Sequence, residues 1–117
     1  MRFMLEDAGG RRVVFDGEQL ARATSKRPGK DRWIELDLFK TNLGVYVLLG
    51  VGKTTIKDEN EWRWTYSSKD PMSILTKLHR QDRAGGTYLT NVAHRLLTRA
   101  SEVDVGIAGV YRIFHVG

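Results

Sequence analysis

The feature that most constrains the fold is a change in the spacing of apolar residues at Asp70 and Pro71. Before this point hydrophobic side chains recur at every second position, and after it they recur every three or four positions. The first spacing is typical of strands with one buried face, and the second is typical of amphipathic helices. Strands followed by helices predict an α+β fold, because a parallel α/β sheet would alternate the two.

The segment 2–67 is predicted to form an antiparallel β-meander sheet. Short turns rich in glycine or polar residues separate the apolar runs, and such turns join antiparallel neighbours. Residues 17–25 fit a helical turn as well as a twisted strand, and we favour a strand because a Pro-Gly turn and a long strand follow. The run 45–51 is apolar on both faces, which predicts that it is the central strand.

A helical hairpin is predicted to pack on one face of this sheet, with helices at 71–84 and 87–104. Asp70 suits the N-cap and Pro71 the first helical position, while glycines at 85 and 86 are expected to end the first helix. Residues 110–116 alternate well enough to predict a last strand that returns to the sheet. With 117 residues, the chain is expected to be a single domain, 1–117.

The inventory of chemically active side chains is small. The chain has no cysteine, which removes disulfides, thiolate ligands and cysteine nucleophiles. His79, His94 and His115 lie on different predicted elements without metal-ligand spacing. Glu35 and Asp37 share one strand face, where exposed carboxylates usually carry no chemistry. We therefore expect no catalytic set, no cofactor and no metal site.

No stretch approaches the ~20 apolar residues of a membrane span. The start of the chain turns acidic at Glu6 and Asp7 before an apolar core of a signal peptide could form. We therefore expect a cytoplasmic protein with no membrane partner.

The string Gly50 to Thr55, Gly-Val-Gly-Lys-Thr-Thr, resembles the end of a nucleotide-binding P-loop, including the variant of ParA-type ATPases. A full P-loop has glycine where this chain has Val47, and the ParA variant has Lys and Gly at the positions of Leu48 and Leu49. The motif must also open a helix, but a polar turn and a strand follow here. Our interpretation is that the string is not functional and that its glycines allow a bulge or bend in a strand.

The charge balance favours a polyanionic partner, since 19 Lys and Arg against 14 Asp and Glu give a net charge of +5. Much of the excess lies between positions 22 and 32. A solvated loop would have the same composition. The candidate binding surface consists of Arg22, Lys26, Arg27, Lys30, Arg32 and Arg63.

Two further patterns leave alternatives open. Trp62, Trp64 and Tyr66 could stack nucleic-acid bases or could be core under the helices. The two-helix unit fits an ordinary helical hairpin and, in outline, a helix-turn-helix. In the second case the basic residues near its surface would be Lys77, Arg80, Arg83, Arg95 and Arg99.

The run from Trp33 to Thr41, followed by Gly44 and Tyr46, resembles a hairpin of short uncharacterised proteins of actinobacteria and their phages or mobile elements. This resemblance implies no activity and no catalytic residue.

These patterns favour a non-enzymatic binding or regulatory module that engages an acidic protein or nucleoprotein through its basic surface. The resemblance leaves an origin in a phage or mobile element open. Direct binding of DNA or RNA is the alternative, and a small enzyme with a distributed site is a second alternative. A homodimer is conceivable through the last strand or through an uncovered face at Phe39 and Tyr46.

Overall fold

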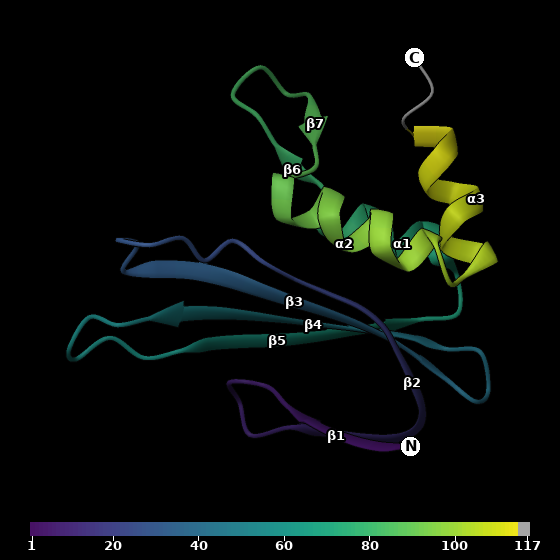
Figure 1. The fold of residues 1–117 in the computed structure, drawn as a ribbon, viewed down its shortest axis with the longest axis horizontal. Helices are drawn as coiled ribbons and strands as arrows, with labels where there is room; N and C mark the ends of the chain where they lie inside the picture. The colour runs from purple at the N-terminus through teal and green to yellow at the C-terminus, as the bar shows by residue number, and fades with distance from the viewer. Residues whose placement is uncertain (115–117) are drawn as a thin grey trace.

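The computed structural model describes residues 1–114 and has the predicted α+β architecture (Figure 1). Its main sheet is antiparallel, with strand order β1-β2-β3-β4-β5, and helices cover one face. The strands are β1 (Arg2–Glu6), β2 (Arg12–Thr24), β3 (Arg32–Thr41), β4 (Tyr46–Thr54) and β5 (Trp62–Ser68). The remaining elements are α1 (Pro71–Leu78), a small hairpin of β6 (Arg80–Gln81) and β7 (Thr87–Tyr88), α2 (Asn91–Ser101) and α3 (Val105–Phe114). The meander is therefore confirmed, including a strand at 17–24.

The sheet is curled so that both of its faces are covered. Figure 1 shows β2 bending and carrying the β1–β2 hairpin beneath β3, β4 and β5, while the helices lie on the other side. Gly17 allows the bend, because a Cβ there would lie 2.2 Å from the carbonyl oxygen of Lys40. The hairpin also reaches β5, where the Ala8 N–H donates to the Arg63 carbonyl at 3.2 Å. We call the two sides of the sheet the helix face and the hairpin face.

Each face has its own apolar core. On the helix face, sheet residues such as Leu38 and Leu48 pack against the buried faces of α1 and α2. On the hairpin face, the rings of Phe3, Phe15 and Phe39 lie 4.8 to 5.5 Å apart between centroids. β4 contributes to both cores and pairs with β3 and β5, so it is an interior strand as predicted, although β3 is the middle strand of the five.

The expectation of an uncovered face at Phe39 and Tyr46 is wrong. Phe39 is 5% exposed under the β1–β2 hairpin, and Tyr46 is 3% exposed under the helices. The two side chains point to opposite faces of the sheet, so they do not form one dimer surface.

The start of α1 agrees with the sequence. Asp70 caps the helix by accepting the Met72 N–H at 3.0 Å, and Pro71 occupies the first turn. The predicted extension to residue 84 is wrong, because α1 ends at Leu78 and His79 is extended. The Asp82 carboxylate accepts backbone N–H groups across the next turn, which favours the β6–β7 hairpin over a helix.

The C-terminal elements also differ from the prediction. α2 begins at Asn91, with Thr90 as its N-cap, and not at 87. The predicted strand at 110–116 is wrong for residues 110–114, which belong to α3, and residues 115 and 116 lie outside the described residues. The helix is favoured because Asp104 caps it at the Ile107 N–H and the Ile107 side chain is fully buried.

Asp104 ties α3 to the sheet. Its carboxylate accepts hydrogen bonds from the Tyr46 hydroxyl at 2.6 Å and from Lys40 Nζ at 2.9 Å. Gly106 makes room, since a Cβ there would lie 2.3 Å from the Tyr46 hydroxyl. Burial alone would raise the pKa of Asp104, but the hydrogen bonds from Tyr46, Lys40 and the Ile107 N–H outweigh it and lower the pKa.

The glycines of the P-loop-like string have a packing role. Gly50 pairs across the strands with Trp64, and a Cβ at Gly50 would lie 2.2 Å from the indole ring. Gly52 pairs with Trp62, where a Cβ would meet its nearest atoms at 3.5 Å. The register of β4 with both neighbours is unbroken, so the expected bulge is absent and the glycines instead give the indoles space on the strand.

Replacing Gly50 tests this packing. We expect Gly50→Ala to lower the free energy of unfolding by about 1–3 kcal/mol, because the added methyl overlaps a ring that is wedged between strand and helices. Gly52→Ala is the matched control and should cost less than about 1 kcal/mol, since its Cβ meets ordinary contact distances. Urea unfolding measures both. Equal losses in the two variants would contradict the assignment.

Asp104 should make stability depend on pH. Because its pKa is lowered on folding, its contribution is present above the ordinary Asp range and is lost as pH falls through the folded value. We expect Asp104→Asn to cost about 2 kcal/mol or more at pH 7, and the gap from wild type to shrink on acidification. Urea unfolding at several pH values measures this. A gap that stays constant down to pH 2 would show that the carboxylate is not stabilised by folding.

Candidate functional site

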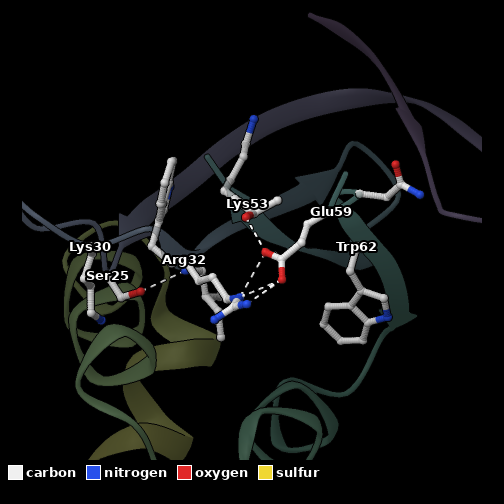
Figure 2. A pocket seen from close by; sticks show the side chains of 11 residues that line it. Ser25, Lys30, Arg32, Lys53, Glu59 and Trp62 are labelled. Carbon is white, nitrogen blue, oxygen red and sulfur yellow. Dashed lines mark hydrogen bonds and ion pairs between the residues drawn. The ribbon is translucent and has the colours of Figure 1, made fainter. Parts of the chain in front are cut away.

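Two hollows meet at Trp62, and together we call them the tryptophan groove. The first, about 630 Å³, lies between the turn before β3 and the ends of β4 and β5. Figure 2 labels six of its lining residues, which are Ser25, Lys30, Arg32, Lys53, Glu59 and Trp62. The second, about 260 Å³, lies between the sheet and the junction of α1 with α2. Ile34 and Trp62 line both hollows, so the two hollows are adjacent.

Trp62 is the most unusual residue of the groove. It is the first residue of β5, lies on the helix face and is 55% exposed. Its ring centroid is 6.2 Å from that of Trp64, which is partly buried under the helices. Figure 2 shows the Trp62 indole across the first hollow from Ser25 and Lys30. Since burying a large aromatic side chain is worth ~1.5–3 kcal/mol, this indole offers binding energy to a ligand.

Arg32 and Glu59 lie between these two sides of the first hollow (Figure 2). Arg32 Nε donates to both Glu59 carboxylate oxygens at 3.0 and 3.1 Å, and the Thr54 hydroxyl donates to the same carboxylate at 2.6 Å. Hydrogen bonding to Glu59 raises the pKa of Arg32, and hydrogen bonding from Arg32 lowers that of Glu59. This pair holds the turn before β5 against the start of β3.

The other cations of the groove have different surroundings. Lys53 pairs with Glu61 at 3.0 Å, and Lys77 Nζ lies 5.5 Å from the ring centroids of both Trp64 and Tyr66. Within residues 1–114, no carboxylate oxygen lies within 4.0 Å of the charged nitrogens of Lys30 or Arg80. These two charges are therefore available to an anionic ligand.

The candidate surface inferred from the sequence does not form one patch. Arg22 and Arg63 lie on the hairpin face, opposite the groove. Arg22 pairs with Glu35 at 3.0 Å, and Arg63 Nε donates to the Glu6 carbonyl at 2.8 Å. Both are held by groups of the fold itself.

The remaining four predicted residues lie around the turn between β2 and β3. Lys26 Nζ sits 4.7 Å above the Trp33 ring, and Arg27 is exposed on the turn. Lys30 and Arg32 line the first hollow. The structure thus brings two of the six predicted residues to the groove. Sequence reasoning did not single out Glu59, and it considered Lys53 only in the P-loop-like string and Lys77 and Arg80 only for a helix-turn-helix. Their place in the groove depends on the tertiary packing of separate elements.

The helix-turn-helix outline is wrong. The β6–β7 hairpin separates α1 from α2, where a helix-turn-helix has a turn of only a few residues. Two arginines of α2 are also engaged, since Arg95 donates to the Thr24 carbonyl at 2.6 Å and Arg99 donates to the Arg22 carbonyl. They fasten α2 to β2.

Glu35 and Asp37 are less exposed than expected and belong to a network on the hairpin face. Gln19 Nε2 donates to Asp37 at 2.6 Å, and Trp33 Nε1 donates to Glu35 at 3.1 Å. Burial raises the pKa of Asp37. Burial also acts to raise that of Glu35, but the Trp33 hydrogen bond and nearby cations outweigh it and lower the pKa. Neither carboxylate lines the groove.

Among residues 1–114, no three His, Asp or Glu side chains gather where they could hold a metal ion. No helix from Met1 to Phe114 has the length and apolar character needed to cross a membrane.

No family model, curated protein or solved structure matches the chain. The resemblance of the Trp33 to Tyr46 segment to proteins of actinobacteria and their mobile elements stays a prediction.

The P-loop-like string is predicted to be inactive toward nucleotides. Residues 50–54 lie within β4 and pair with β3 or β5, so their backbone N–H groups cannot wrap a phosphate, and Lys53 is bound to Glu61. Purified protein should release no phosphate from ATP or GTP above background, and Lys53→Ala should not change that background. Turnover that disappears in Lys53→Ala would overturn this reading.

Proposed function

We propose that the protein is a non-enzymatic binding module that holds an anionic macromolecule in the tryptophan groove. The observation that carries this proposal is the half-exposed indole of Trp62 at the meeting point of two hollows, with cations around it. Lys30 comes from the turn between β2 and β3, Lys77 and Arg80 come from the end of α1 and the start of β6, and all three line the groove. Apolar surface rimmed by positive charge suits a ligand that is anionic and only partly polar.

Several polar side chains of the groove are already bound to one another, which favours a binding role over an enzymatic one. Arg32, Glu59 and Thr54 satisfy one another, and Lys53 is bound to Glu61. A general acid or base must reach a substrate atom within hydrogen-bond distance. Among the described residues lining the groove, the Glu59 carboxylate is paired with Arg32, and His79 Nδ1 lies 2.6 Å from the Leu75 carbonyl oxygen, so both groups already have partners within the fold.

This proposal keeps the anionic partner expected from the net charge and moves its binding surface from the 22–32 segment to the groove. An acidic protein or a nucleoprotein would satisfy the charge requirement equally. A cytoplasmic location, a homodimer and an origin in a phage or mobile element stay predictions that the groove does not address.

Binding of linear polyphosphate, a polyanion without rings, tests the charge requirement. We expect it to quench tryptophan fluorescence and to bind more weakly at about 200 mM than at about 50 mM salt, because binding releases counterions. The double variant Lys30→Ala/Arg80→Ala should bind about tenfold more weakly. Lys69→Ala/Arg112→Ala removes the same charge from exposed positions outside the groove and should change binding little.

Two results would refute the proposal. One is the absence of polyphosphate binding even at low salt. The other is an equal loss in the two double variants, which would mean that only net charge matters and that the groove has no part.

A further inference from the structure

We infer that the ligand of the tryptophan groove is single-stranded nucleic acid, with one base stacked on the indole of Trp62. This inference rests on the proposed function and names the class of ligand. It follows from the shape of the exposed aromatic surface, from the apolar second hollow next to it and from the position of the cations.

The first step concerns the indole itself. Trp62 carries a large flat ring and is 55% exposed as a residue, and its cross-strand neighbour Gly52 has no side chain to cover the ring. A side chain at position 52 would contact the ring, since a Cβ there would lie 3.5 Å from Trp62 Cε3. A nucleic-acid base is flat and stacks on such a ring whatever its identity. An acidic peptide supplies carboxylates but needs no ring.

The second step concerns the adjoining hollow. Most of its lining side chains are apolar groups of the sheet and helices, with Trp64 among them, and Trp62 also lines it. Lys77 and Arg80 line the same hollow. A strand whose first base lies on Trp62 can place the next base in this hollow and its phosphates beside the two cations. Alternating bases and phosphates match alternating apolar surface and charge.

The third step concerns the acidic residues. Glu59 lines the first hollow and Glu61 lies beside it, and either would repel a phosphate if it were unpaired. Glu59 is bound by Arg32, and Glu61 is bound by Lys53 at 3.0 Å. The groove-lining cations without a carboxylate within 4.0 Å include Lys30 in the first hollow and Lys77 and Arg80 in the second. The phosphate chain is therefore expected to run from one hollow to the other.

A duplex does not fit this arrangement. In double-stranded nucleic acid the faces of the bases are stacked on one another, so no face is available to Trp62. Single strands expose these faces, and both DNA and RNA do so.

The test compares oligonucleotides that share phosphates but differ in bases. Fluorescence anisotropy would measure binding of a labelled thymidine 12-mer, a uridine 12-mer and an abasic 12-mer with the same number of phosphates. We expect wild-type protein to bind the thymidine or the uridine 12-mer about tenfold or more tightly than the abasic one, because stacking adds to the charge contacts. The tighter of the two identifies DNA or RNA as the preferred source.

Variants test whether the tighter binding of base-containing 12-mers depends on the groove. Trp62→Ala should abolish the advantage over the abasic 12-mer, and Trp62→Tyr, which keeps a stacking ring, should retain most of it. Leu43→Ala removes a residue that is 86% exposed in the turn between β3 and β4 and should leave binding unchanged. Thermal unfolding checks each variant, and Trp62→Tyr keeps the test decisive if Trp62→Ala folds poorly.

The outcomes separate this inference from the proposed function. Equal binding of base-containing and abasic 12-mers, with polyphosphate binding intact, would overturn the inference and leave the proposed function standing. Tighter binding of a glutamate-rich peptide, or equal binding of a DNA duplex, would also overturn it. Loss of all polyanion binding at low salt would contradict both the inference and the proposed function.

Discussion

The contact between the Trp64 indole and Gly50 determines the arrangement on which the candidate site depends. The ring lies against β4 because that strand position has no side chain, and a Cβ there would overlap it at 2.2 Å. Two residues earlier on β5, Trp62 projects from the same face at the edge of the helices, where it is half exposed. The glycines that make 50–55 look like a nucleotide-binding motif thus serve the two indoles, and the indoles in turn shape the groove.

Several of the basic residues singled out in the sequence are engaged by the fold itself. Curling of β2 at Gly17 covers the hairpin face, where Arg22 pairs with Glu35 and Arg63 binds a carbonyl of β1. On the other side, Arg95 and Arg99 fasten α2 to β2. These four arginines therefore have structural roles. Lys30 and Arg80 line the groove that contains the exposed Trp62 ring and have no carboxylate within 4.0 Å, which is why the proposals centre on the groove.

Much of the fold could be predicted from local sequence, because strand periodicity, turn residues and the Asp70 cap are properties of short segments. The failures have physical causes. The apolar residues of 110–114 fit the spacing of a strand as well as that of a helix. The Asp104 cap and the buried Ile107 side chain favour the helix α3. The glycines after Asp82 suit a hairpin turn as well as a helix end. The site was harder to predict, because pairings such as Arg32 with Glu59 join residues 27 positions apart and decide which cations are free.

The most direct measurement of the central claim is an NMR study of labelled protein with a thymidine oligonucleotide, which can detect contacts between individual protons. The account predicts nuclear Overhauser contacts between the Trp62 indole ring and thymine base protons, together with shifts at Arg80. Contacts confined to the hairpin face around Arg22 and Arg63, or an unperturbed Trp62 ring in a saturated complex, would contradict it.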